Sequence, residues 1–243
     1  MKKARIRVPS LQHLARVWDP DASRIQKTLV NLSLNGPTFS YQLIYELIED
    51  LIHYKIPYDQ VERAVQSRVH RENVRSNFLE LLPLINSQLS GIDASFVHRV
   101  SPRQYPIAKH LTVPFSPPFI YGEAGVIHMP WFSLWKANPL SGKRLKLFVT
   151  IVDEILAQDP DLDEAVFSIL DFSAKEAGGE REVRVLHSDD IGRLTRDELV
   201  SMLSVFVEGY EAACAELQLH EGEKRHKGLD KVLDVDQLDL FQR

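Results

Sequence analysis

The sequence lacks the features that mark several large classes of protein. Cys214 is the only cysteine among 243 residues, which excludes an intramolecular disulfide and a cluster of thiolate metal ligands. We find no apolar run long enough to cross a bilayer and no secretory leader, so we expect a cytoplasmic protein without a membrane partner. The formal net charge of −5 argues against a broad nucleic-acid-binding surface, although a local basic patch remains compatible with it.

Sequence motifs of the common catalytic centres are also missing. Gly142 and Lys143 lack the upstream glycine of a phosphate-binding loop, and there is neither a His-Glu-x-x-His motif nor a nucleophile elbow. The nine histidines are scattered, and none pairs with another at the spacing of metal ligands. We therefore expect no cofactor, no metal and no catalytic residue, and a non-enzymatic role.

Composition and periodicity predict an α+β protein with an ordinary core. The length of 243 residues suits one large domain or two small ones, and a hydrophobic content of 44% is sufficient for a core of that size. We predict a helical domain over residues 1–92 and a proline-rich connector over 93–118. An α+β domain over 119–219 and a flexible tail over 220–243 follow.

Helical periodicity dominates the first part of the chain. Apolar residues recur at helical spacing over residues 11–18, and Ser23 is placed to cap the next helix. Three further helices are predicted over 38–56, 59–69 and 73–89, the last with a kink or break at Pro83. This arrangement predicts an N-terminal helical bundle.

The second part alternates between hairpins and helices. A hairpin is predicted over residues 119–134, with its turn at 122–125, and is followed by a helix over 141–158 that is apolar enough to be buried on two sides. A second hairpin is predicted from 165–172 and 181–187, and a capping box at 195–198 opens the last helix. The order ββ–α–ββ–α predicts helices packed on a mainly antiparallel sheet.

Two sets of side chains are candidates for nucleic-acid contact. Trp131, Phe132 and Trp135 form the most aromatic stretch, which suits either base stacking or burial in a core or interface. The basic candidates lie near the N-terminus or on one surface of the helices predicted over 59–69 and 73–89. They are Lys2, Lys3, Arg5, Arg7, Arg68, Arg71 and Arg75, with a solvated surface or a protein-binding module as the alternative.

The order of elements after residue 119 is similar to that of restriction-endonuclease-like, or PD-(D/E)XK, nucleases. These have a hairpin, a lysine at the end of its second strand, a helix and a further strand, and they hold Mg²⁺ with an acid on one strand and an acid-x-Lys on the next. Here Lys136 stands at the strand end, but Leu134 occupies the acid position and Glu123 falls in a predicted turn. The resemblance implies a degenerate nuclease fold used as an adaptor or, alternatively, a Mg²⁺-dependent nuclease or nuclease subunit.

Five residues near the end of the chain carry three apolar side chains, Leu238, Leu240 and Phe241, on a charged tether. They are Gln237, Leu238, Asp239, Leu240 and Phe241. All five match the Gln-Leu-Ser/Asp-Leu-Phe pentapeptide by which bacterial proteins bind the DNA polymerase sliding clamp, so this segment resembles a clamp-binding motif. The resemblance implies that Leu240 and Phe241 enter an apolar pocket of the clamp and that Gln237 supplies orienting hydrogen bonds.

These patterns predict an accessory or adaptor protein bound to the bacterial sliding clamp. We expect it to act in DNA replication, DNA repair, mobile-element transfer or antiphage defence, with DNA contacted only indirectly or weakly. A further protein subunit is the expected partner of the folded body. The alternative is a tail that packs on its own chain or on a neighbour within a stable complex.

Overall fold

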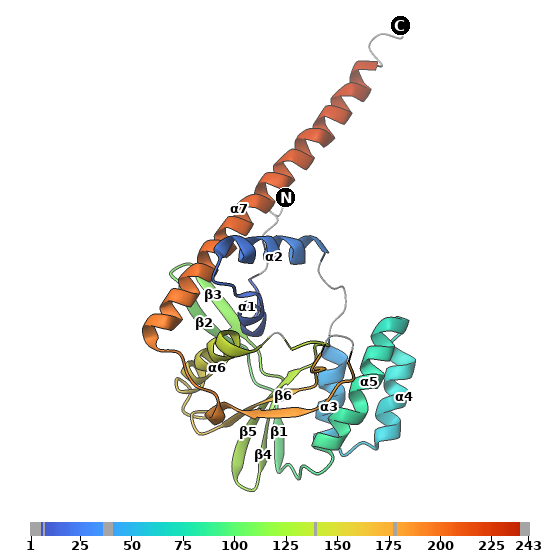
Figure 1. The fold of residues 1–243 in the computed structure, drawn as a ribbon. Helices are drawn as coiled ribbons and strands as arrows, with labels where there is room; N and C mark the ends of the chain where they lie inside the picture. The colour runs from blue at the N-terminus through green and yellow to red at the C-terminus, as the bar shows by residue number, and fades with distance from the viewer. Residues whose placement is uncertain (1–5, 7, 36–40, 139, 177–178, 239–243) are drawn as a thin grey trace.

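The structure is a computed structural model that describes residues 6, 8–35, 41–138, 140–176 and 179–238, with side chains as far as residue 218. A mixed five-stranded sheet forms its centre (Figure 1). Its strands, in spatial order, are β1 (Phe96–His98), β4 (Ile120–Glu123), β5 (Val126–Ser133), β6 (Val166–Asp171) and β7 (Arg184–His187). Neighbouring strands are antiparallel except for β5 and β6, which are parallel and are connected through helix α6 (Gly142–Leu156).

Helices and a small second sheet surround this centre. The second sheet pairs β2 (Arg103–Ala108) with β3 (Leu111–Phe115). A short 3₁₀ turn, Ser188–Asp190, follows β7. The remaining helices are α1 (Leu11–Val17), α2 (Ala22–Asn35), α3 (Gln42–His53), α4 (Tyr58–Arg68), α5 (Glu72–Leu89) and α7 (Arg196–Leu238).

The two faces of the central sheet enter two separate apolar cores. Alternate side chains of a strand point to opposite faces, so Met129 and Trp131 of β5 join the core of α1, α2, α6 and α7. Phe132, the next residue along β5, joins the core of α3, α4 and α5. The sheet is therefore the middle layer between two groups of helices (Figure 1).

The structure confirms the predicted α+β fold class and the order of elements after residue 119. Strands β4 and β5, helix α6, strands β6 and β7, and helix α7 follow one another as ββ–α–ββ–α. Eight residues of α6 are buried, as its wide apolar surface predicts. The capping box is also present, because Thr195 and Glu198 exchange hydrogen bonds between side chain and backbone N–H of 2.9 and 3.3 Å.

Several local features differ from the sequence-based expectation. The segment 93–118, predicted as a connector, contains β1, β2 and β3, and both apolar cores draw residues from before and after residue 92. Helix α5 continues through Pro83, which lies on its exposed side, so the predicted break is absent.

Helix α7 is the longest element of the protein. Its N-terminal part packs along α2, and its C-terminal part extends away from the body as far as Leu238 (Figure 1). The backbone of residues 220–238, predicted as a flexible tail, is thus helical. In the part of the chain that the structure describes, none of the helices has the length and apolar character needed to span a bilayer.

Candidate functional site

The predicted clamp-binding segment lies largely outside the described residues. Asp239, Leu240 and Phe241 belong to that undescribed part, and for Gln237 and Leu238 only the backbone is described, as the end of α7. The N-terminal basic candidates Lys2, Lys3, Arg5 and Arg7 also lie outside the described residues.

The remaining basic candidates are engaged with groups of the same chain. Arg68 forms an ion pair of 3.6 Å with Glu46. Arg75 pairs with Glu72 and donates a hydrogen bond of 3.3 Å to the carbonyl oxygen of Val69. Arg71 also interacts within the protein. These internal partners reduce the positive potential that a phosphate would meet.

The residues that suggested a nuclease site are not brought together. Glu123 pairs with Val126 at the start of β5, whereas Lys136 follows the other end of that strand. The eight residues of β5, Val126–Ser133, span about 23 Å at the rise of an extended strand, and Lys136 lies beyond that end. Within the described ranges, no group of three or more His, Cys, Asp or Glu side chains is placed to hold a metal ion.

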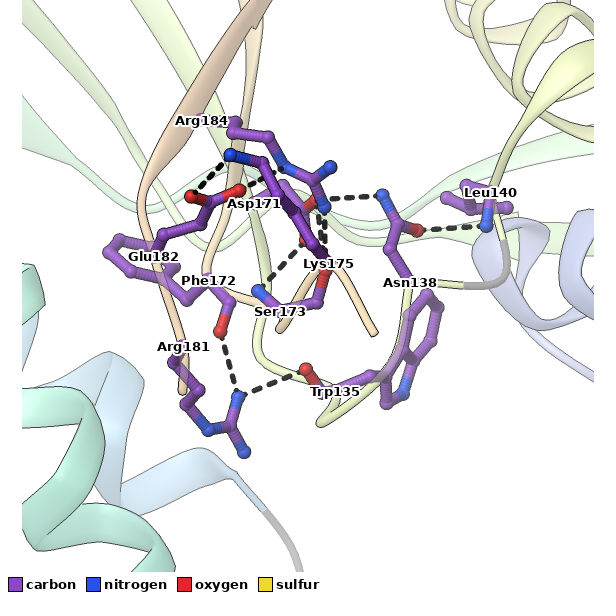
Figure 2. Close-up of polar contacts among 10 residues, drawn as sticks. All are labelled: Trp135, Asn138, Leu140, Asp171, Phe172, Ser173, Lys175, Arg181, Glu182 and Arg184. Carbon is purple, nitrogen blue, oxygen red and sulfur yellow. Dashed lines mark hydrogen bonds and ion pairs between the residues drawn. The ribbon is translucent and has the colours of Figure 1, made fainter. Parts of the chain in front are cut away.

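A buried polar cluster lies at the carboxyl ends of the parallel strands β5 and β6 (Figure 2). Asp171, the last residue of β6, is fully buried and accepts hydrogen bonds from Arg184 Nη2 at 2.5 Å and Asn138 Nδ2 at 2.9 Å. The backbone N–H of Ser173 donates to the second carboxylate oxygen at 3.2 Å, and the Ser173 hydroxyl lies 3.1 Å from the first. Asp171 therefore joins the end of β6 to Asn138, which follows β5, and to Arg184 of β7.

Arg181 connects this cluster to helix α5. Its side chain is only 2% exposed, and Nη1 donates to the carbonyl oxygens of Trp135 and Phe172, both at 2.9 Å, as Figure 2 shows. Nη2 donates to Asn77 Oδ1 at 2.6 Å, and Nε lies 3.4 Å from Glu80. Acceptors at both terminal nitrogens anchor the buried guanidinium, whereas Nε has an ion-pair partner but no hydrogen bond within the described residues.

An aromatic cleft, formed by two adjoining cavities, lies between α1, α3 and the end of β5. The cavities have volumes of about 300 and 310 Å³, and both are lined by Gln12, Tyr45 and Trp131. Trp131 and Phe132 are 3% and 1% exposed, so these two rings belong mainly to the cores. Trp135 is half-buried and lines the second cavity.

Three residues of α1 supply polar groups to the aromatic cleft. The Arg16 guanidinium lies 5.0 Å from the centre of the Trp135 ring, and the His13 ring centre lies 5.7 Å from it. The surrounding protein displaces water from Arg16 and lowers its pKa. Desolvation, helped by the charge of Arg16, also lowers the pKa of His13, although that side chain keeps an exposed edge. Gln12 Oε1 is buried without a hydrogen-bond partner among the described residues.

The other cavity has a charged rim. Glu49 of α3 pairs with Arg99 at 2.8 Å, and Glu46, also on α3, lines the same cavity. Burial raises the pKa of the Tyr45 hydroxyl, which keeps the ring neutral. Flat apolar walls with a few convergent polar groups are typical of a small-molecule site.

Sequence reasoning identified only one side of the aromatic cleft. It singled out Trp131, Phe132 and Trp135 as an aromatic stretch, but not Gln12, His13 and Arg16, which reach the cleft because α1 packs against α6 and β3. Gln12 and Arg16 are separated by four residues, a spacing that places them on one side of a helix and was the available signal.

Comparison with known proteins finds no protein-family model that matches this chain and no similar curated protein.

Proposed function

We propose that this protein is an accessory or adaptor protein that attaches to the bacterial sliding clamp through residues 237–241. The observation that carries the proposal is the match of all five residues to the clamp-binding pentapeptide. The folded body then recruits a second protein to DNA in replication, repair, mobile-element transfer or antiphage defence.

The expected attachment is weak and exchangeable. Burying Leu240 and Phe241 contributes roughly 1.5–3 kcal/mol for each side chain, and ordering the segment offsets part of this gain. A micromolar dissociation constant, about −8 kcal/mol, is the expected result. Because the clamp is a ring of repeated subunits, two copies of this protein bound to one ring raise the apparent affinity through avidity only if they also contact each other.

A titration of the labelled full chain with purified bacterial sliding clamp tests the proposal by fluorescence polarisation. Replacing Leu240 and Phe241 by alanine together should abolish binding. The matched control replaces Leu233 and Val235, two apolar residues upstream of the motif, by alanine and should bind the clamp like the unchanged protein. Binding that survives the Leu240→Ala/Phe241→Ala change rules this mechanism out.

A Mg²⁺-dependent nuclease, or a subunit of one, is the second candidate. The observation that favours it is the sheet itself, in which a hairpin is followed by a helix and by a strand parallel to the hairpin's second strand. The separation of Glu123 from Lys136 argues for a degenerate member that serves as an adaptor. Plasmid cleavage in Mg²⁺ or Mn²⁺ that is lost in Lys136→Ala would reverse the ranking.

A further inference from the structure

The aromatic cleft contains two polar groups of α1 whose bonding is incomplete within the described residues. Gln12 Oε1 is a buried acceptor without a donor. Such an oxygen costs free energy until a donor reaches it. Arg16 stacks over Trp135, and no carboxylate of the described residues lies within ion-pair distance of its guanidinium. A ligand that fits both groups carries an N–H donor and an anion.

The walls between these two groups restrict the rest of the ligand. Trp131 and Trp135 stand edge to face, with ring centres 5.6 Å apart, and Tyr45 of α3 also lines the cavity. Rings of this kind favour a flat, polarisable group, and stacking on an aromatic side chain is the usual way in which proteins hold an unpaired base. Cavities of about 300 Å³ are at the lower end of the range for ligand sites, so the ligand is compact.

We propose that the aromatic cleft binds a nucleoside monophosphate unit whose base carries an exocyclic amino group. In this arrangement the base lies against the half-buried ring of Trp135, its amino group donates to Gln12 Oε1, and the phosphate contacts Arg16. Glutamine is well suited to an adenine edge, and the arginine fork to a phosphate. The unit is either a free nucleotide or one nucleotide of a single strand, and this inference does not depend on attachment to the clamp.

Binding of 2′-deoxyadenosine 5′-monophosphate (dAMP) to the full chain, followed by tryptophan fluorescence and calorimetry, tests the inference. We expect saturable binding of dAMP at micromolar to millimolar concentration. Thymidine 5′-monophosphate, whose base has no exocyclic amino group, should bind more weakly. The quenching of tryptophan fluorescence by dAMP should be lost in Trp135→Leu. The same titration with a 5′-phosphorylated deoxyadenosine tetranucleotide distinguishes a free nucleotide from a strand end.

Two variants assign the separate contacts. Gln12→Leu should weaken dAMP about tenfold, the order of a lost hydrogen bond to a buried group, without lowering the thermal stability of the free protein. Arg16→Gln should weaken dAMP about tenfold but leave deoxyadenosine, which has no phosphate, unchanged. The matched controls Gln60→Leu and Arg63→Gln make the same changes on the exposed side of α4 and should bind normally.

Three results would overturn the inference. They are no binding of dAMP or of the tetranucleotide at millimolar concentration, binding that neither Gln12→Leu nor Arg16→Gln weakens, and a preference for an aromatic carboxylate such as N-acetyltryptophan over dAMP. The clamp-binding variant Leu240→Ala/Phe241→Ala should keep its dAMP affinity. Its behaviour therefore separates a failure of this inference from a failure of the proposed function.

Discussion

The indole Nε1 of Trp18 donates a buried hydrogen bond of 2.9 Å to the backbone carbonyl oxygen of Met202, 184 residues later in the chain. Trp18 follows α1 directly, and Met202 lies in the second turn of α7. The contact therefore joins the beginning of the chain to its last helix. Arg144 of α6 donates to the carbonyl oxygen of Trp18 at 2.8 Å, so three helices meet at this residue.

Replacing Trp18 should lower the free energy of unfolding substantially. Trp18→Ala removes a side chain that is 8% exposed and should cost about 3–5 kcal/mol. Trp18→Phe keeps much of the apolar volume and loses the hydrogen bond, for a cost of about 1–3 kcal/mol. Urea unfolding measures both. Trp135→Phe, at a half-buried ring, is the control and should cost less than Trp18→Phe; equal costs would contradict the assigned role.

Gly209→Ala should destabilise the protein although alanine is the better helix former. A Cβ at this position of α7 would lie 2.7 Å from the carbonyl oxygen of Ala22 and 2.7 Å from Ile25 Cβ. Overpacking of this kind costs about 1–3 kcal/mol, which exceeds the gain in helix propensity of about 1 kcal/mol. Gly91→Ala is the control, because its Cβ would meet no atom within 4 Å. A stabilised Gly209→Ala protein in thermal unfolding would show that α2 and α7 pack less closely.

Removing Arg181 should be among the most damaging single changes. Arg181→Leu leaves three carbonyl oxygens without their donor and should cost about 3–5 kcal/mol, because each buried acceptor left without a donor costs about 1–3 kcal/mol. Arg181→Lys keeps the charge but cannot reach acceptors on several sides, so only a small part of the stability should return. Urea unfolding measures the effect. Arg63→Lys, at a 68% exposed side chain, should change little.

His13 should make the stability fall as the pH is lowered. Its pKa in the folded protein lies below the ordinary value of 6.5, first because of desolvation and second because of Arg16. The unfolded chain therefore binds a proton at a higher pH than the folded protein does. The stabilising contribution is complete above pH 6.5 and is lost as the pH falls through the folded-state pKa.

An NMR titration of the His13 ring measures this pKa directly. Arg16→Gln should bring the value partly back toward 6.5, because it removes the second cause but not the first. In His13→Gln the unfolding free energy should depend less on pH below 6.5. A folded-state His13 pKa above 6.5 would contradict the prediction.

Local patterns in the sequence predicted most of the elements but fewer of their boundaries. The alternation in residues 181–187 and the continuous apolar character of 165–172 were sufficient to predict β7 and β6 as a hairpin. The strands β1 and β2 were missed because they lie among the prolines and basic residues of a segment that reads as a connector. Their strand conformation comes from pairing with β4 and β3, which are distant in sequence or joined by a tight turn.

The sequence by itself determined the α+β class, the order ββ–α–ββ–α after residue 119, the capping box at Thr195 and Glu198, and the pentapeptide on which the proposed function depends. Each of these is written in neighbouring residues, through the period of a helix or strand or through a short motif. Only the tertiary structure decided that Glu123 and Lys136 stand at opposite ends of a hairpin, that Asp171 accepts hydrogen bonds from Arg184 and Asn138, and that α1 completes the aromatic cleft. These are relations between residues far apart in the chain, and they exist only once the two faces of the sheet are buried by different helices.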